Sequence, residues 1–498
     1  MIKKMFLILI ISLAVFAKNS PKINGFFIQP ALGYGAPAYD LNHLKTQESF
    51  DDWIKSMADV GANMLFYQWV SRYEYNQTWF TNVHGGEPSA DFCYYTPDLK
   101  VINGISANSW MKSITDWSNG SNISPIEKAL IAGEKHGVDI WLGLYLNEDA
   151  SHTTYNWWDA VAGSDITVKD TAIFRYHVER SIDIAQDIYN KFGNYSSFGG
   201  FYYSIEIANN IVLNNEKHWD ILAWTLDSVA AEVYKLGGKR LAISPFFNTH
   251  SDQGFMTAEK YGEMWDYMLS KLSTKNLVVM LQDGAGVEPN TIGKIEPFYR
   301  AVSDACKKNG ITFWGNSELF TNPSGDRMAS TSQPTNIEML LEQMKIASEF
   351  ADTFVCFSYL SMDSYTQTLP SFLNANDSYS LTKRTKLYDD YKAYYDSIKN
   401  EIPDTTDTTI IDTTTAISAK KLNVRNQNIS VFGNKISIPK FDKPVSYSLI
   451  SPNGKVVLSG VANEAKVINV PAAMGVYILK LNAGTQTPIR QKIFLQLK

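Results

Sequence analysis

The sequence predicts an α/β protein in which a (β/α)8 barrel, residues 18–400, precedes a Thr- and Asp-rich linker, 401–417, and a small all-β sandwich, 418–498. Three observations predict this fold class. Short apolar or aromatic segments alternate with longer amphipathic ones from residue 23 to about 400, as parallel strands joined by helices do. The linker composition cannot build a core. Short alternating segments separated by Gly-containing turns follow it.

The eight predicted strands are continuous apolar or β-branched segments, and the eight predicted helices are the amphipathic segments between and after them. The strands are 23–30, 63–70, 140–146, 198–207, 240–247, 277–283, 312–320 and 353–363. The helices are 50–60, 125–136, 171–192, 216–236, 258–272, 295–309, 336–350 and 381–398. An open doubly wound sheet is the alternative fold. It would have a Gly-rich phosphate turn after its first strand, where this chain has Gln29-Pro30.

Residues 1–17 have the features of a secretion signal. Lys3 and Lys4 precede an apolar run over 5–16, and small residues favour cleavage after Ala17. The run is too short to cross a membrane, and no later segment approaches the roughly 20 apolar residues that a span needs. We therefore expect the mature chain to be secreted or held at the cell surface.

Charge divides the chain into two chemically distinct parts. Residues 418–498 hold 12 Lys and Arg against only Asp442 and Glu464, a net charge of +10. The whole chain carries −6, and Lys3 and Lys4 give residues 1–17 a charge of +2, so the body between residues 18 and 417 carries −18. An acidic body argues against nucleic acid as a partner, because phosphate binding depends on basic side chains. From the three cysteines, Cys93, Cys306 and Cys356, we expect no disulfide framework.

Two carboxylates stand at predicted strand ends, where barrels of this type carry their active sites. The fourth strand ends at Glu206 and the seventh at Glu318. Cleavage of a glycosidic bond through a covalent intermediate needs two carboxyl groups roughly 5 Å apart, and these two ends face each other across a barrel. The pair predicts catalysis by Glu206 and Glu318. The alternative is a structural ion pair with Arg72 or Arg327, since a buried charge needs a partner.

Other strand ends supply amides for sugar hydroxyls and rings for stacking. The predicted substrate-binding residues are Gln29, Gln68, Trp69, Tyr203, Asn248, Gln282, Asp283, Trp314, Asn316 and Tyr359. Asp283 could be a third functional carboxylate; Glu148 is a fourth candidate, with a solvated loop position as its alternative. Trp157-Trp158 form either a substrate platform or core packing.

Metal and serine chemistry find little support in the sequence. None of the seven histidines falls on a predicted strand, where barrel metallohydrolases place their ligands. No G-x-S-x-G nucleophile turn occurs. We therefore expect no metal and no cofactor, and a monomer whose partner is a carbohydrate substrate.

Six short motifs in order resemble the family called domain of unknown function 4434, over essentially the whole barrel. They are 24–30, Gln68-Trp69, 201–206, 244–247, 282–286 and 314–318. That resemblance implies a secreted glycoside hydrolase without naming its sugar. The Glu pair also resembles clan A of the retaining glycoside hydrolases, which implies Glu206 as acid/base and Glu318 as nucleophile.

One departure from the clan keeps other functions open. The clan has Asn before the strand-four Glu, and Ile205 stands there in this chain. A non-catalytic glycan-binding barrel is therefore the alternative function, and a lyase or transglycosylase is a third.

The C-terminal segments 451–456 and 475–480 are similar to the sorting domains of type IX secretion. That resemblance implies export across an outer membrane, with the secretion machinery as a partner. A carbohydrate-binding or fibronectin-like module is the alternative, although residues 418–498 contain no Trp.

Overall fold

The structure is a computed structural model that describes most of the barrel and the strands of the C-terminal part. The described ranges are 20–28, 46–74, 90–93, 95, 101–102, 105–106, 111–113, 123–147, 156–161, 168–249, 254–287, 289–323, 332–367 and 375–399, and then 422–424, 427–432, 435–438, 445–450, 456–464, 466–470, 475–482 and 489–495. Several sequence predictions lie outside them: the signal 1–17, Gln29, Glu148, Arg327 and the linker 401–417.

Eight parallel strands close into a barrel, which confirms the predicted fold class. Their order around the barrel is β1, β2, β8, β10, β11, β12, β13 and β16, and β1 pairs with both β2 and β16. The bounds are β1 Ile23–Ile28, β2 Met64–Tyr67, β8 Asp139–Gly143, β10 Phe198–Tyr203, β11 Leu241–Ile243, β12 Leu277–Gln282, β13 Thr312–Glu318 and β16 Phe354–Phe357. Each lies within a predicted strand, except that β8 begins one residue earlier.

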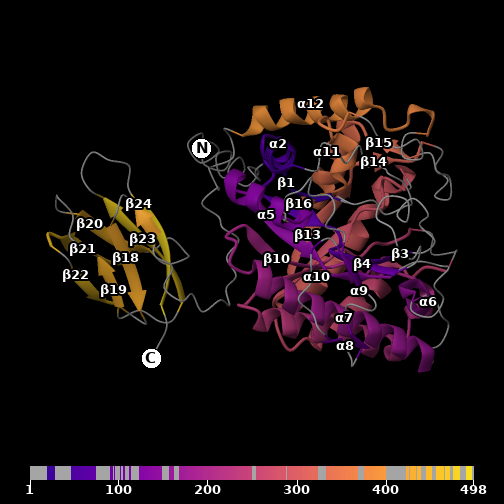
Figure 1. The fold of residues 1–498 in the computed structure, drawn as a ribbon, viewed down its shortest axis with the longest axis horizontal. Helices are drawn as coiled ribbons and strands as arrows, with labels where there is room; N and C mark the ends of the chain where they lie inside the picture. The colour runs from indigo at the N-terminus through magenta and orange to yellow at the C-terminus, as the bar shows by residue number, and fades with distance from the viewer. Residues whose placement is uncertain are drawn as a thin grey trace, which may run out of the picture. The chain divides into compact units, whose positions relative to one another are not determined.

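Helices surround the barrel, as Figure 1 shows. They are α2 Gln47–Ala58, α5 Pro125–His136, α7 Val168–Phe192, α8 Glu216–Lys235, α9 Ala258–Ser270, α10 Ile295–Asn309, α11 Ile337–Ala347 and α12 Leu381–Ile398. Their boundaries follow local chemistry. The side chains of Thr46, Ser124 and Asn336 cap helix N-termini by accepting a backbone N–H. Gly137 and Gly310 end α5 and α10 in the left-handed conformation, which glycine adopts without steric cost.

Two apolar clusters show which way each strand residue points. One contains residues of the barrel strands alone and therefore fills the interior; its members include Phe27, Phe66, Trp141, Tyr202, Met280 and Trp314. The other combines alternate strand residues with residues of the surrounding helices. Side chains alternate between the two faces of a strand. Within a strand, a residue of the interior cluster therefore points inward, and the residues on either side of it point outward toward the helices.

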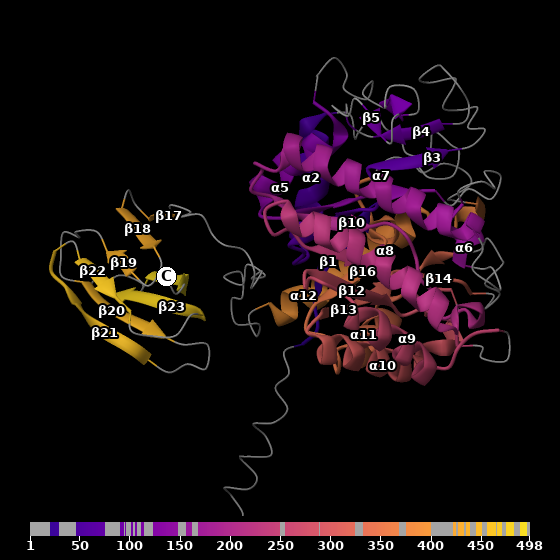
Figure 2. The same ribbon diagram turned by 90° about the horizontal axis from the view of Figure 1, so that it is seen from below.

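Part of the long connection after β2 forms a small sheet that the sequence did not predict. It joins β3 Ser71–Glu74, β4 Ala90–Cys93 and β7 Met111–Ser113 to β9 Tyr145–Leu146, which follows β8 directly. Strands β3 and β4 can be followed in Figure 2. The connection after β9 contains one short helix, α6 Trp157–Val161.

The chain divides into two compact units, residues 1–414 and 415–498. The second unit is all-β and has two four-stranded antiparallel sheets, in the orders β17-β18-β19-β22 and β21-β20-β23-β24. Their bounds are β17 Leu422–Val424, β18 Gln427–Phe432, β19 Lys435–Ile438, β20 Val445–Ile450, β21 Val456–Ala462, β22 Lys466–Asn469, β23 Gly475–Asn482 and β24 Ile489–Leu495. Within the described ranges, no helix has the length and apolar character to cross a membrane.

Candidate active site

The C-terminal ends of the barrel strands form the mouth of the barrel, where several polar side chains meet. Tyr202, Met280 and Trp314 point into the interior. Gln282, Asn316 and Glu318 follow Met280 and Trp314 in steps of two within β12 and β13, so they are directed inward as well. Ser204 and Glu206 lie beyond the end of β10, and a hydrogen bond from Gln282 places the carboxyl group of Glu206 beside these residues. The apolar interior cluster lies beneath these polar residues.

Glu206 lies three residues beyond the end of β10 and is held at two points. Nε2 of Gln282 donates a hydrogen bond of 3.0 Å to Oε1 of Glu206, and another of 2.9 Å to the carbonyl of Ser244. Nε1 of Trp157 donates to the Glu206 carbonyl at 2.7 Å. Glu206 as a whole is partly exposed, whereas its carbonyl and one carboxyl oxygen are fixed by these hydrogen bonds.

Glu318, the last residue of β13, is only 3% exposed. Its Oε2 accepts hydrogen bonds from the backbone N–H groups of Gly286, at 2.6 Å, and Val287, at 3.1 Å. It has no ion pair within the described part of the chain. Backbone dipoles rather than a cation therefore hold this carboxyl group. The side chain of Arg72 lies outside the described residues, as Arg327 does.

Asp283 lies behind the mouth rather than in it. It follows the inward-facing Gln282, points outward toward α11 and is 1% exposed. Its Oδ1 accepts hydrogen bonds from the N–H groups of Ala285, at 3.1 Å, and Glu318, at 3.4 Å. Its Oδ2 accepts one of 2.9 Å from Nε2 of Gln343. A substrate in the mouth does not reach Asp283, which instead supports the residues around it.

The carboxyl groups of this region perturb one another. Burial raises the pKa of Glu318 from 4.5 to about 8; the charges of Asp283 and Glu206 add to the rise, and the two backbone hydrogen bonds oppose it. Burial also raises the pKa of Asp283 to about 6, against the hydrogen bonds that it accepts. Among the causes of the raised pKa of Glu318, the charge of Glu206 contributes less than burial and the charge of Asp283.

Three aromatic residues predicted to bind substrate lie instead between the barrel and its helices. Trp69 is 2% exposed, and Tyr203 and Tyr359 are fully buried; all three belong to the outer cluster. The hydroxyl of Tyr359 is 2.6 Å from that of Ser56 on α2. For Tyr203 the physical reason is alternation, because it follows the inward-facing Tyr202 and so points the other way. Tyr359 is the first residue of a 3-10 helix, Tyr359–Met362, that follows β16, so strand alternation does not set its direction. These rings pack the helices onto the barrel and are out of reach of a ligand in the mouth.

Trp314 and Asn316 face the interior at greater depth. Trp314 precedes Glu318 by four residues, about 13 Å along a strand. Its ring packs edge-on against that of Trp141, with centroids 5.8 Å apart, so it belongs to the apolar interior. Asn316 is fully buried, and its Nδ2 donates 2.8 Å to Oγ of Ser244. Asn316 thus lies directly beneath the mouth.

Gln68 and Asn248 are partly exposed at the mouth. The carbonyl of Gln68 accepts a hydrogen bond of 2.7 Å from Oγ of Ser204. The backbone N–H and carbonyl of Asn248 both pair with the side-chain amide of Asn209, at 2.8 Å each. Both residues are therefore held through their backbones and are partly exposed.

The two tryptophans of α6 have different surroundings. Trp157 is fully buried, and its ring packs edge-on against Phe174 with centroids 5.3 Å apart. Trp158 is partly exposed, and its ring centroid lies 6.0 Å from that of Phe246. Trp157 is therefore a residue of the packed core, and its indole nitrogen also anchors the backbone of Glu206.

Sequence reasoning missed Gly286 and Gln343 as residues of this site. A Cβ atom on Gly286 would lie 2.7 Å from Oε2 of Glu318 and 2.5 Å from the carbonyl oxygen of Phe320, so only glycine fits there. Gln343 is fully buried on α11, beside the buried Leu340 and Met344. A polar residue on the apolar face of a helix was the signal that could have identified it.

Tyr379 is a further residue near the site. It lies just before α12 and is buried, and its pKa is raised by burial and, more weakly, by the charge of Glu318. Arg384 fixes this segment because its Nε donates 3.0 Å to the Tyr379 carbonyl.

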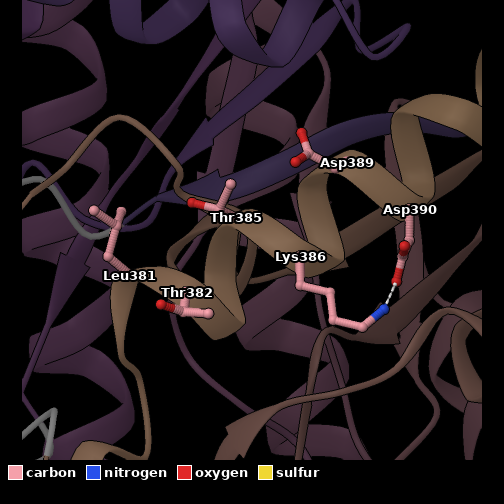
Figure 3. Close-up of a pocket in the computed structure, with 6 residues that line it drawn as sticks. All are labelled: Leu381, Thr382, Thr385, Lys386, Asp389 and Asp390. Carbon is pink, nitrogen blue, oxygen red and sulfur yellow. Dashed lines mark hydrogen bonds and ion pairs between the residues drawn. The ribbon is translucent and has the colours of Figure 1, made fainter.

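An open depression of about 520 Å³ lies elsewhere, on α12. Its lining residues are Leu381, Thr382, Thr385, Lys386, Asp389 and Asp390, all from this one helix (Figure 3). Lys386 and Asp390 form an ion pair there. None of the strand-end residues lines this depression, so it is separate from the candidate site. In the described part of the chain, no group of three or more His, Cys, Asp or Glu could hold a metal ion.

Comparison with solved structures finds similar structures at low sequence identity. A candidate alpha-L-fucosidase from Bacteroides thetaiotaomicron VPI-5482 aligns with a TM-score of 0.50 and 15% identity, over 76% of this chain and 96% of that one. A GH5_18 protein from Streptomyces cattleya, in complex with GlcNAc, aligns at 0.41 and 10%, over 77% and 82%. A glucosidase from Croceicoccus marinus aligns at 0.38 and 12%, over 96% and 94%. At these identities the likeness concerns the fold alone.

Sequence comparison finds no match among curated proteins. It does find one family, over residues 23–370, which span all eight barrel strands. The chain therefore belongs to the family described as Domain of unknown function (DUF4434).

Proposed function

We propose that this protein is a glycoside hydrolase that cleaves a poly- or oligosaccharide by a retaining mechanism, with Glu206 and Glu318 as its two carboxylates. One observation carries the proposal. Two carboxyl groups, beyond the end of β10 and at the end of β13, are held by one short segment: Gln282 donates to Glu206 at 3.0 Å, and Gly286 and Val287 donate to Glu318 at 2.6 and 3.1 Å. Retaining glycosidases need such a pair on either side of the bond that they cleave.

The surroundings of each carboxyl group suit a different role. Two backbone N–H groups fix Glu318, as a nucleophile that must attack one carbon atom requires. Glu206 is partly exposed and can exchange its proton with water, as an acid/base residue must do in the two steps. We therefore assign Glu318 as nucleophile and Glu206 as acid/base, the same roles that the clan A resemblance implies. Because a nucleophile attacks in its charged form and the pKa of Glu318 is about 8, this assignment predicts that hydrolysis rises as the pH is raised through about 8.

The rest of the mouth supports a sugar as the ligand. The side chains of Gln68, Asn248 and Gln282 offer amides, which can donate to and accept from hydroxyl groups. The similar structures include proteins named as a glucosidase and a candidate alpha-L-fucosidase, which is consistent with this substrate class. We further propose that residues 1–17 direct export and that residues 418–498 engage type IX secretion machinery, which would place the enzyme outside the cell or on its surface.

A hydrolysis screen tests the function. The natural protein, Glu206→Gln and Glu318→Gln are incubated with a broad panel of polysaccharides and oligosaccharides, and released sugars are measured. Glu342→Gln, the same change at an exposed position of α11, is the matched control. We expect hydrolysis of at least one glycan by the natural protein and the control, and loss of about 10³-fold or more in each strand-end variant. Near-natural turnover by either strand-end variant would contradict the proposal.

Analysis of the first product tests the mechanism. A retaining enzyme releases a sugar with the anomeric configuration of the substrate, which NMR spectroscopy detects before mutarotation. Inverted product would overturn the retaining mechanism, and an unsaturated sugar would indicate a lyase.

A non-catalytic glycan-binding barrel is the second candidate function. The observation in its favour is the fully buried Ile205, which stands before Glu206 where clan A has an Asn. Binding of a glycan without release of any product, undiminished in Glu318→Gln, would establish this alternative.

A further inference from the structure

One short segment, Gln282–Val287, contacts both glutamates. We propose that this segment is the positioning element that sets Glu206 and Glu318 relative to each other, and that the buried Asp283 is its anchor. The inference deepens the proposed function, on which its catalytic consequence rests. It also revises the sequence prediction for Asp283, from a substrate-binding residue to a positioning residue.

The first contact is made inside the mouth. Gln282 ends β12, and its Nε2 donates both to Oε1 of Glu206 and to the carbonyl of Ser244 at the end of β11. The second hydrogen bond fixes the amide, because rotating it would place its oxygen against the Ser244 carbonyl. Gln282 therefore orients the carboxyl group of Glu206 from a side chain that is itself 9% exposed.

The second contact is made by the turn that follows. Gly286 and Val287 donate two backbone hydrogen bonds to the same oxygen, Oε2 of Glu318. The position of that oxygen is set by the course of the backbone and not by a flexible side chain. Any change in the turn is therefore transmitted directly to the carboxyl group of Glu318.

Asp283 joins the turn to the end of β13. One of its oxygens accepts from the N–H groups of Ala285 and Glu318, and the other from Gln343 on α11. Nε2 of Gln343 also lies 3.4 Å from the Glu318 carbonyl. Asp283 thus connects three pieces of chain that the sequence separates by up to 60 residues.

Gly286 leaves no room for adjustment in this arrangement. The Cβ atom of any other residue would collide with the Phe320 carbonyl oxygen at 2.5 Å and with Oε2 of Glu318 at 2.7 Å. One of these neighbours is backbone, so the turn and the carboxyl group would have to separate. Gly293 is a matched position on the same connection, because a Cβ atom there meets nothing within 4 Å.

The anchor also acts through its charge. Within the described residues, the titratable groups around Glu318 and Asp283 are Glu206 from beyond the end of β10, Tyr299 from α10, Cys356 from β16 and Tyr379 from before α12. Each of these groups is neutral or negative over the physiological pH range. Removal of the Asp283 charge therefore reduces the electrostatic repulsion on the charged form of Glu318. None of the groups just named supplies a positive charge in its place.

The titration of Glu318 tests the anchor without any assay of activity. Its carboxyl carbon is observed by ¹³C NMR in the full chain labelled at Glu, and it is assigned by its loss in Glu318→Gln. We expect Asp283→Asn, which keeps one oxygen acceptor, to move this titration down by about one pH unit or more. Asp304→Asn, the same change at an exposed position of α10, should leave it in place. An unmoved Glu318 titration in Asp283→Asn would overturn the inference.

Gly286→Ala tests the turn independently, in case Asp283→Asn does not fold. Loss of the two N–H donors destabilises the charged carboxylate, so we expect the Glu318 titration to move up, opposite to the shift in Asp283→Asn. Gly293→Ala is the control and should titrate like the natural protein. Equal titrations in Gly286→Ala and Gly293→Ala would also overturn the inference.

An activity measurement separates this inference from the proposed function. On a glycan that the natural protein cleaves, the ascending limb of kcat/KM against pH should move to lower pH in Asp283→Asn, with KM little changed. A limb that stays in place would contradict the inference. If no glycan is cleaved by any variant while the two titrations shift as described, the proposed function fails and the positioning element stands.

Discussion

Glu318 combines two environments that act in opposite directions on its charge. Two backbone N–H groups favour the carboxylate, whereas burial and two neighbouring carboxyl groups favour the neutral acid. The outcome is a pKa of about 8, so folding takes up a proton at this residue over much of the acidic and neutral range. The consequence can be measured as stability, whatever the protein acts on.

The pH dependence of unfolding should carry this signature of Glu318. A raised pKa in the folded state contributes stability that is fully present below the ordinary value of 4.5 and is lost as pH rises through about 8. Glu318→Gln stays neutral at every pH, so its unfolding free energy should fall less over this range than that of the natural protein. We expect the difference in unfolding free energy between the natural protein and Glu318→Gln to change by a few kcal/mol over this pH range, which is on the order of what proton linkage gives for such a shift in the pKa of Glu318.

Urea denaturation at a series of pH values measures this difference. Asp283 is present in both proteins, so its own raised pKa affects both in the same direction. Parallel stability curves for the natural protein and Glu318→Gln would show that Glu318 is not a perturbed acid.

At the scale of elements, the barrel strands could be predicted from sequence and the small sheet could not. Each barrel strand is a continuous apolar segment followed by an amphipathic helix, a signal that repeats eight times. In contrast, β7 and β9 have three and two residues, too few for a periodic pattern to be recognised. The sheet depends on pairing between Ser71-Arg72 and Tyr145-Leu146, which are distant in the sequence and which a local pattern does not predict.

The sequence predicts those site residues that are polar and lie at strand ends. It does not predict the direction in which a strand-end side chain points, or contacts between residues far apart in the chain. Glu206, Gln282 and Glu318 are strand-end residues and face the mouth. Tyr203 and Tyr359 are strand-end residues too, but they face the helices, and counting in steps of two from Glu206 would have excluded Tyr203. The hydrogen bonds of Gly286 and Val287 to Glu318 depend on the turn conformation, which sequence spacing does not reveal.

Helix α6 anchors Glu206 through Trp157, which yields a prediction at this scale. Trp157→Phe keeps most of the buried ring but loses the 2.7 Å hydrogen bond to the Glu206 carbonyl. We expect unfolding free energy to fall by about 1 kcal/mol, and kcat to fall about tenfold because Glu206 is less well oriented. Trp219→Phe is the matched control: it loses a 2.6 Å hydrogen bond to the Leu213 carbonyl, away from the mouth. Equal kcat values in the two variants would show that the hydrogen bond from Trp157 is not needed to orient Glu206.

At the scale of the whole molecule, two units with separate hydrophobic cores make up the chain. The barrel core is built from strands and helices, whereas Ile436, Leu449 and Leu479 belong to the core of the C-terminal sheets. The division coincides with the charge asymmetry seen in the sequence, an acidic body and a basic C-terminal part. Each unit therefore has its own balance of stabilising forces.

Calorimetry of the full chain should show this independence. Because each unit has buried apolar residues of its own, we expect two unfolding transitions. The transition with the larger enthalpy should belong to the barrel unit, since unfolding enthalpy scales with the number of residues. A single transition whose calorimetric and van't Hoff enthalpies agree would show that the units unfold together.

The most direct test of the two-carboxylate account is a double-variant comparison on a glycan that the natural protein cleaves. Glu206→Gln, Glu318→Gln and the double variant are compared by kcat/KM. Residues that act as one catalytic unit lose activity together, so we expect each single variant to lose about 10³-fold or more and the double variant to lose little beyond the more severe single one. Losses that multiply in the double variant, or a single variant that retains near-natural activity, would contradict the assignment of Glu206 and Glu318 as the catalytic pair.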